Sequence, residues 1–421
     1  MARIRGTEGM EVNIAPSGVE DSPYAWMRLG LALVLGTIGG VGMWSAVVVL
    51  PSIQQEFGLD RADASLPFTM VTIGFALGGV LMGKLADRFG VALPVAIGGA
   101  CLGIGYVIAG MAQSLWLFTA AHAIPIGLLG SSAVFGPLMA DSSRWFIRNR
   151  GIAVAISAAG NYLAAAIWPP VVQLMIDTIG WRTGHIVIGL VCAVVLIPMS
   201  LLVRRRPPAH APVVAGQAHG VALRGISPDR MMVLLCVAGV MCCVAMSMPQ
   251  VHIVAYCGDL GYGVARGAEM LSLMFGFGVI SRLATGWIAD RIGGLWTLLL
   301  GSVLQAVALM MYFVFDGLTS LYVVSALFGL FQGGIIPSYA IIVREYFPAR
   351  EAGTRVGIVL MMTILGMALG GWMSGAIFDL TGSYRAAFAN GFAWNLVNVV
   401  IAVLLLRRSR PASPKLVEGI A

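Results

Sequence analysis

The chain has 421 residues, of which 59% are apolar and only 11% are charged, and its formal net charge is +7. A soluble fold of this size could not bury so much apolar surface, because the exterior of a soluble protein must be polar. Intrinsic disorder is excluded as well, since disordered chains are poor in apolar residues and rich in charge. A membrane-spanning helix takes about 20 apolar residues, so the composition predicts an all-α membrane protein with roughly a dozen transmembrane helices.

The apolar segments form two sets of six, and they lack the short alternating pattern of barrel strands. A polar tail at 1–26, with no signal-peptide pattern, precedes an N-terminal bundle at 27–203. A basic linker at 204–229 leads to a C-terminal bundle at 230–406, and a second tail covers 407–421. The twelve predicted spans are approximately 27–50, 66–84, 92–112, 115–139, 151–175, 184–203, 231–256, 268–288, 294–314, 319–342, 355–377 and 386–406.

The positions of lysine and arginine predict the orientation of these spans. With both termini in the cytosol, 21 basic residues fall on the inner side and only Arg61, Arg182, Arg266 and Arg385 on the outer side. A basic cytosolic face beside anionic lipid explains the net charge, so we expect no nucleic-acid partner. The short loops and compact chain favour the plasma membrane of a bacterium.

The six cysteines lie in or at the ends of apolar segments, and they do not form a CxxC motif or a disulfide framework. The neighbours Cys242 and Cys243 could form a metal or redox pair, but buried small side chains are the favoured interpretation. We therefore expect no metal site and no cofactor.

An internal repeat relates the two halves. Gly83–Gly90 reads GKLADRFG and recurs as GWIADRIG at Gly286–Gly293, an offset of 203 residues. Each copy closes the second helix of its half. Two further pairs keep nearly the same offset: Arg144-Trp145-Phe146 with Glu345-Tyr346-Phe347, and Gly180-Trp181-Arg182 with Ser383-Tyr384-Arg385. The halves are therefore duplicates.

Two copies of this motif, twelve spans and a basic central linker resemble the major facilitator superfamily of secondary transporters over nearly the whole chain. The resemblance implies two six-helix halves that rock around a substrate site near the bilayer midplane, which a monomer can perform.

The motif also has a physical interpretation. A carboxylate at Asp87 or Asp290 could cap a neighbouring helix or pair with an arginine, holding the cytosolic ends of the halves together. The glycines permit close packing and a tight turn. A plain positively flanked turn is the alternative. The predicted gating residues are Gly83, Asp87, Arg88, Gly90, Gly286, Asp290, Arg291 and Gly293.

Arg282 is the strongest candidate for substrate binding. It lies eight residues before Asp290, roughly 12 Å from the cytosolic boundary at 1.5 Å per helical residue. No acidic residue lies one turn away, because positions 278 and 286 are both glycine. An intramembrane guanidinium needs an anion, which a substrate carboxylate can supply in bidentate fashion. The alternative is pairing with backbone carbonyls or a distant side chain.

Other polar side chains predicted inside the spans are weaker candidates. His252 follows Pro249, which could kink its helix, and a histidine can exchange protons near neutral pH. His122 has the same chemistry, whereas His185 is interpreted as structural. Asn161, Gln332 and Tyr106 lie near mid-depth and could bind a substrate or bridge helices.

Within the superfamily, the stretch from Pro249 to Gly293 resembles the monocarboxylate and oxalate/formate branches. Both keep an arginine on the eighth helix for the substrate carboxylate, which implies that role for Arg282. The chain departs from the animal monocarboxylate carriers, since segment 27–50 has no lysine and Gly278 stands where they have an aspartate. It also lacks the lysine that oxalate/formate exchangers carry on helix 11.

One buried cation favours a monoanion such as lactate or pyruvate, because a dianion would leave an uncompensated charge. Proton symport follows, since anion and proton together move no net charge, with His252, His122 or the substrate carboxyl group carrying the proton. A carboxylate antiporter of the oxalate/formate type, or a carrier of another small solute, is the alternative.

Other classes find less support in the sequence. Sugar carriers usually show more amides and aromatics, and proton-driven drug exporters a carboxylate in the first helices. A membrane enzyme would need a catalytic motif such as HExxH or GxSxG, which the sequence lacks, so no enzymatic activity is expected. A nutrient sensor on the same fold stays open.

Overall fold

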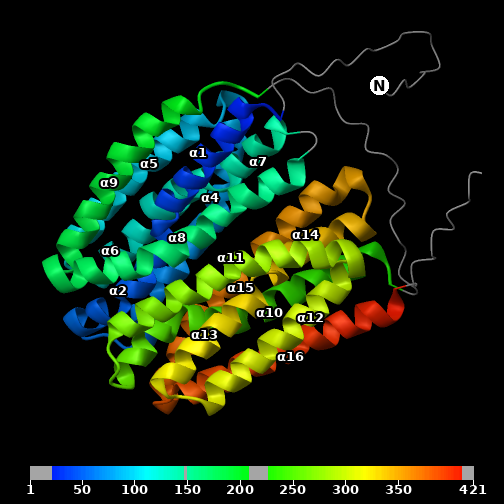
Figure 1. Ribbon diagram of the computed structural model, residues 1–421. Coiled ribbons are helices and arrows are strands. Elements are labelled where there is room, and N and C mark those ends of the chain that lie inside the picture. Colours follow the sequence, from blue (N-terminus) through cyan, green and yellow to red (C-terminus); the bar gives the residue numbers. More distant parts are fainter. Residues whose placement is uncertain (1–20, 147–148, 208–225, 410–421) are drawn as a thin grey trace, which may run out of the picture.

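The computed structural model describes residues 21–146, 149–207 and 226–409. In this part of the chain, twelve helices are long and apolar enough to cross a membrane. Most of the predicted tails and of the linker lie outside the described residues. Figure 1 shows the helices as two bundles, one coloured blue to green and the other green to red.

The N-terminal half contains the first six spans. Three of its spans are interrupted: the first at Gly40, the second at Ser65, and the fourth by the π-helical stretch η1 and the short η2. Its elements are α1 (Pro23–Gly39), α2 (Val41–Phe57), α3 (Arg61–Ala64), α4 (Leu66–Phe89), α5 (Ala92–Met111), α6 (Leu115–Ala121), η1 (His122–Gly130), η2 (Ser131–Val134), α7 (Gly136–Trp145), α8 (Arg150–Ile179) and α9 (Trp181–Leu202).

The C-terminal half contains the other six, and its fourth span is interrupted at Gly333 and Gly334. Its elements are α10 (Pro228–Asp259), α11 (Val264–Ile292), α12 (Gly294–Val314), α13 (Leu318–Gln332), α14 (Ile335–Tyr346), α15 (Ala349–Thr381) and α16 (Tyr384–Arg408). The prediction of six spans, a linker and six spans is confirmed. Most helices run past their predicted apolar segments, and α1 begins with a capping bond in which the Ser22 side chain accepts from the Ala25 N–H.

The repeat in the sequence is a repeat in the backbone. Gly90 ends α4 with φ of +86° and Gly293 ends α11 with φ of +82°, a region that favours glycine. Phe146 and Phe347 likewise leave α7 and α14 in the same extended conformation. We call the end of the molecule with these two glycine turns the motif end, and the opposite end, where α3 lies, the Arg61 end.

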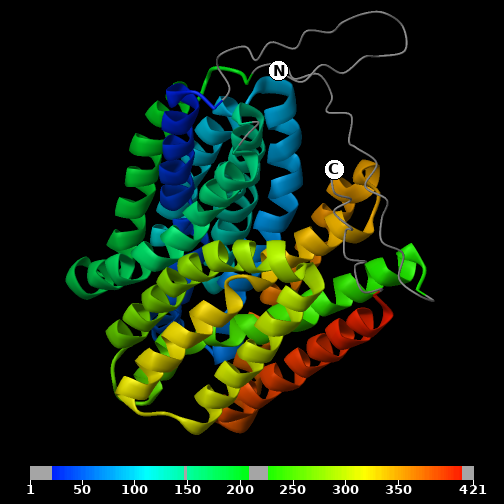
Figure 2. The same ribbon diagram turned by 45° about the vertical axis from the view of Figure 1, so that its right-hand side comes forward.

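The two halves meet along four pairs of helices: α8 with α11, α4 with α15, α2 with α10, and α3 with α15. Figure 2 shows the same two bundles from a second direction. The largest buried cluster spans this boundary and joins Trp44, Phe68 and Tyr162 of the N-terminal half to Phe275 and its neighbours in the other half. The central part of the boundary is therefore apolar.

Candidate functional site

Arg282 lies on α11 at the boundary between the two halves. Its guanidinium carbon is 3.6 Å from the ring centroid of Tyr162, which comes from α8 of the other half. Its Nε is buried and has no hydrogen-bond partner, and no described residue forms an ion pair or hydrogen bond with this side chain. A guanidinium held by a ring face alone keeps its charge and its N–H groups free for an anion.

Three aromatic rings continue from this guanidinium across the boundary. Tyr162 packs edge-on against Phe275 at a centroid distance of 5.2 Å, and Phe275 contacts Trp44 at 4.2 Å. The indole N–H of Trp44 is buried and has no partner among the described residues. These rings from both halves give one side of Arg282 an apolar surrounding, in which electrostatic attraction is stronger than in water.

Gln332 forms a pair with Gln250. Gln250 Nε2 donates to Gln332 Oε1 at 2.8 Å. The remaining amide atoms, Gln250 Oε1 and Gln332 Nε2, are buried without a partner in the described structure. The pair therefore retains one acceptor and one donor, which could hold a ligand hydroxyl or carboxylate.

Both ring nitrogens of His252 already have partners in this conformation. Nε2 donates to the carbonyl oxygen of Gly371 at 2.8 Å, because a carbonyl can only accept. Nδ1 is 3.2 Å from the hydroxyl of Tyr384, which can then donate to it. The prediction that His252 binds substrate therefore requires a conformation in which one of these hydrogen bonds opens. Helix α10 itself continues past Pro249 to Asp259.

His122 and Tyr106 lie in the core of the N-terminal half. The Nδ1 atom of His122 is 3.0 Å from the carbonyl oxygen of Phe118, and its Nε2 is buried and unpartnered among described residues. The hydroxyl of Tyr106 is 2.7 Å from that of Ser45. The His185 ring is 5.9 Å from His122. No described contact joins this group to Arg282.

Asn161 precedes Tyr162 on α8 and is half-buried. Its side chain lies close to Gly40 of the first span, since a Cβ built on Gly40 would be 3.4 Å from the Oδ1 of Asn161. It makes no hydrogen bond with the described residues. Its position beside Tyr162 places it on the helix that meets α11, although no described contact joins it to Arg282.

The two copies of the predicted gating motif differ in their partners. Asp87 pairs with Arg144 at 2.7 Å, a contact within the N-terminal half. The position equivalent to Arg144 is Glu345, and its carboxylate accepts from the backbone N–H of Gly294 at 3.0 Å. Glu345 therefore caps α12, whereas Asp290 has no partner among described residues.

The remaining motif residues lie at the surface. The guanidinium groups of Arg88 and Arg291 lie over the neighbouring rings of Phe89 and Trp287, at 5.1 and 3.6 Å from the ring centroids. Close packing of Gly83 and Gly286 was expected, but a Cβ added at either would meet no atom within 4 Å. That expectation is wrong for this conformation, since the motif ends of the helices lie open beside these two glycines.

The Arg61 end is held closed by contacts that the sequence did not predict. Arg61 Nη2 donates to both oxygens of Asp259, at 3.0 and 3.1 Å. The backbone N–H groups of Arg61 and Ala62 donate to the carboxylate of Asp379, at 2.8 and 2.7 Å. The guanidinium lies 4.8 Å from the Phe378 ring centroid. Asp259 and Asp379 belong to the C-terminal half, so these contacts join the halves.

A cleft of about 400 Å³ opens beside this ion pair. It is lined by both halves, including Gln54 and Arg61 from one and Asp259 from the other. In the described part of the chain, no hydrogen bond or ion pair joins the halves at the motif end, since Asp87 and Glu345 are used within their own halves. The conformation is therefore closed at the Arg61 end.

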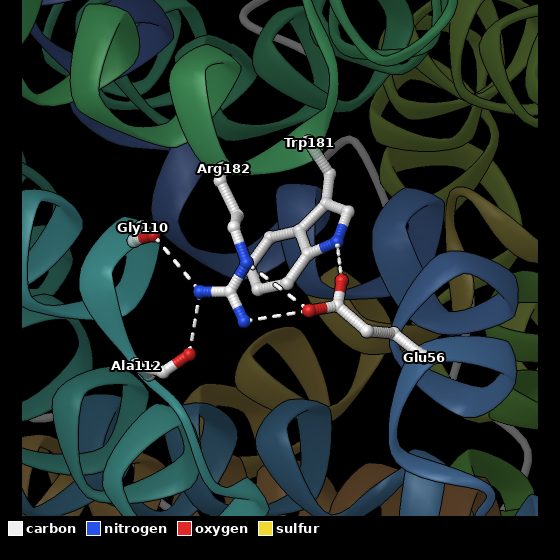
Figure 3. Close-up of polar contacts among 5 residues, drawn as sticks. All are labelled: Glu56, Gly110, Ala112, Trp181 and Arg182. Carbon is white, nitrogen blue, oxygen red and sulfur yellow. Dashed lines mark hydrogen bonds and ion pairs between the residues drawn. The ribbon is translucent and has the colours of Figure 1, made fainter.

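Figure 3 shows an arginine in the opposite situation to Arg282. Arg182 donates to Glu56 at 2.7 and 3.1 Å, and to the carbonyl oxygens of Gly110 and Ala112 at 3.2 and 2.5 Å. Trp181 Nε1 donates to the other Glu56 oxygen at 2.6 Å. All five residues belong to the N-terminal half. This fully partnered network ties α2, α5 and α9 together.

The described residues contain no group of three metal-ligating side chains. Tyr162, Gln250, Asp259 and Asp379 are the partners that sequence reasoning missed. Asp259 and Asp379 are acidic residues at or near the ends of α10 and α15, and nothing in the sequence indicates that they meet Arg61. What the site can do is bind a small anion, since Arg282 is a partly buried cation with a buried, unpartnered Nε and no carboxylate partner among the described residues.

A family profile described as Major Facilitator Superfamily matches residues 32–320 and 270–421. Monocarboxylate transporter 13 of Bos taurus is 28% identical over 407 residues, covering 91% of this chain and 90% of that protein. Monocarboxylate transporter 11 of Homo sapiens is 25% identical over 391 residues, covering 89% and 81%. The MFS-type transporter opdF of Penicillium oxalicum is 25% identical over 425 residues, covering 96% of each.

Solved structures are similar in fold. A bacterial homologue of the human lysosomal transporter Spinster, inward-facing and occupied, matches with a TM-score of 0.73 at 14% identity, covering 93% of this chain and all of that one. The nucleoside transporter NupG matches with a TM-score of 0.68 at 13% identity, covering 91% of this chain.

Proposed function

The chain belongs to the major facilitator superfamily, and we propose that it carries small monocarboxylates such as lactate or pyruvate across the membrane, together with a proton. The transport cycle would be alternating access, in which the two halves rock around a site near the midplane. We place both termini in the cytosol of a bacterium, with a monomer as the transporting unit.

The observation that carries the proposal is the free guanidinium of Arg282. It lies at the boundary of the two halves, and its buried Nε has no partner. Leaving a charge unpaired among apolar helices is costly, so a ligand that supplies the opposite charge would stabilise this site. A carboxylate fits this need, since it can accept two N–H groups of one guanidinium.

The count of charges supports a monoanion. Arg282 is the intramembrane basic residue without an acidic partner in the described structure, so one carboxylate neutralises it. A proton that travels with the anion leaves the transported charge at zero, which favours symport against a membrane potential. The names of the relatives, monocarboxylate transporters 13 and 11, support the same substrate class.

The test is uptake of radiolabelled lactate and pyruvate into proteoliposomes under an inward proton gradient. We expect Arg282→Gln to lower uptake roughly a hundredfold or more, as expected for loss of a buried charge-assisted pair. Arg282→Lys should retain part of the activity, because an ammonium keeps the charge but cannot bind a carboxylate through a planar fork.

The matched control is Arg266→Gln. Arg266 is an exposed arginine near the start of the same helix, and it pairs with Glu269 at 3.0 Å. This variant should transport like the wild type. Uptake that needs an internal carboxylate and ignores the proton gradient would establish exchange in place of symport. Equal lactate and pyruvate uptake by wild type and Arg282→Gln would reject the assignment of the site.

A further inference from the structure

Tyr162 is a residue to which the sequence alone gives no role. Its side chain is 5% exposed, and its ring face lies against the guanidinium of Arg282 at 3.6 Å. The contact crosses the boundary, since Tyr162 lies on α8 and Arg282 on α11. For the arginine it is the one specific contact within the described residues.

The ring fits there because residue 278 is glycine. A Cβ built on Gly278 would lie 2.7 Å from Cε1 and 2.9 Å from Cδ1 of Tyr162. Both distances are shorter than carbon atoms tolerate, so a methyl group at 278 and the tyrosine ring cannot occupy this space together. Gly278 lies one turn before Arg282 on the same helix face. The ring therefore takes the position in which a side chain of α11 would otherwise contact the guanidinium.

Other contacts fix the ring in this orientation. Phe275 packs against it edge-on at 5.2 Å, and Phe275 is itself held by Trp44 at 4.2 Å. Ser272, on the same helix as Arg282, donates to the carbonyl oxygen of Ala166 on α8. This hydrogen bond holds α8 against α11 on the Arg61 side of the rings of Tyr162, Phe275 and Trp44. The Tyr162 ring therefore has little freedom to turn.

A ring face and a carboxylate hold a guanidinium with different consequences. A carboxylate neutralises the charge and occupies the N–H groups, as Glu56 does for Arg182. A ring attracts the cation through its quadrupole, lies over the guanidinium plane and leaves the N–H edge free. The free edge includes the buried Nε of Arg282.

We propose that Tyr162 is the positioning residue of the anion site. Its ring, admitted by the missing side chain at Gly278, orients the Arg282 guanidinium and keeps it charged for an incoming carboxylate. This inference rests on the proposed function for the identity of the anion, a small monocarboxylate. It assigns the preorganisation of the site to a residue from the opposite half of the molecule.

The first test compares transport kinetics of Tyr162→Ala and Tyr162→Phe. A buried cation–π contact predicts that alanine raises the KM for lactate roughly tenfold while the maximal rate changes less. Phenylalanine keeps the ring face and should restore most of the affinity. A phenylalanine variant as impaired as the alanine variant would overturn the proposal, because the hydroxyl would then be the acting group.

Gly278→Ala probes the same contact from the other helix. The added methyl should displace the ring and raise the KM as Tyr162→Ala does. Combined in one chain, the two substitutions should raise the KM no further than either alone, because both remove one interaction. Effects that multiply in the double variant would show that Gly278 acts independently of the ring, and would overturn the proposal.

A third measurement needs no transport. Phenylglyoxal modifies arginine, and the rate at Arg282 can be followed by peptide mass spectrometry on the purified protein, with Arg266 as an exposed reference. Tyr162→Ala should speed modification of Arg282 severalfold and leave Arg266 unchanged. Faster modification without any carboxylate uptake by the wild type would reject the proposed function and support the positioning role. Unchanged modification and an unchanged KM in a transporting protein would reject the positioning role alone.

Discussion

Arg182 and Arg282 are the same residue in opposite surroundings. Arg182 donates to a carboxylate and to two backbone carbonyls, all within the N-terminal half (Figure 3). Arg282 meets a ring of the opposite half, and its buried Nε has no partner in the described structure.

The difference separates a structural charge from the charge that we propose to bind the substrate. Where the fold supplies carboxylate and carbonyl oxygens, an arginine fastens helices together and has nothing left to bind. Where the fold supplies only a ring, the cation retains its attraction for an anion. Exposure alone would not have separated them, because both side chains are partly buried.

The strongest way to break this contrast is to give Arg282 a carboxylate. In Tyr162→Glu the carboxyl group would reach about the depth of the present ring and pair with the guanidinium. We expect lactate uptake at a subsaturating concentration to fall roughly thirtyfold or more, a larger loss than with Tyr162→Ala, because the site would already be neutral. Tyr162→Gln, similar in shape but uncharged, is the control. Equal uptake by the two variants would argue against charge as the deciding factor.

Arg61 lies between the two cases, since its carboxylate partner belongs to the other half. Asp259→Asn weakens this contact and should shift the protein toward conformations open at the Arg61 end. Cys257, buried on α10 two residues before Asp259, is a native reporter. We expect its maleimide labelling to accelerate severalfold, while the buried Cys192 of the other half serves as an internal reference. Glu269→Gln, which breaks the Arg266 pair within one helix, should leave Cys257 as slow as in the wild type.

The smallest expected effect concerns stability. Arg182→Gln removes an ion pair whose side chains are 34% and 40% exposed, so it should cost about 1 kcal/mol and lower Tm by a few degrees. Arg282→Gln should leave Tm unchanged or raise it, because it removes a charge without a partner. A thermal unfolding series in detergent, without substrate, measures both. A larger loss of Tm in Arg282→Gln than in Arg182→Gln would contradict the contrast.

Much of the fold could be predicted from the sequence. Twelve spans, the duplicated halves and the glycine turns at Gly90 and Gly293 follow from local properties: apolar length, a repeated motif and residue type. The candidate Arg282 followed from one local rule as well, that a charge inside an apolar segment is costly and needs a reason. The close packing expected of Gly83 and Gly286 was not found, because close packing depends on which residues of other helices lie opposite each glycine.

The partners of the site were decided by the tertiary structure alone. The ring of Tyr162 meets Gly278 and Arg282 because α8 and α11 cross at that depth, and Arg61 meets Asp259 because the halves close at that end. The ring nitrogens of His252 form hydrogen bonds with Gly371 and Tyr384, which are more than 100 residues away in the sequence. The sequence determines which segments enter the membrane, because that depends on each segment and the lipid. Which side chains meet depends on helix rotation and crossing, which the packing of all twelve helices sets together.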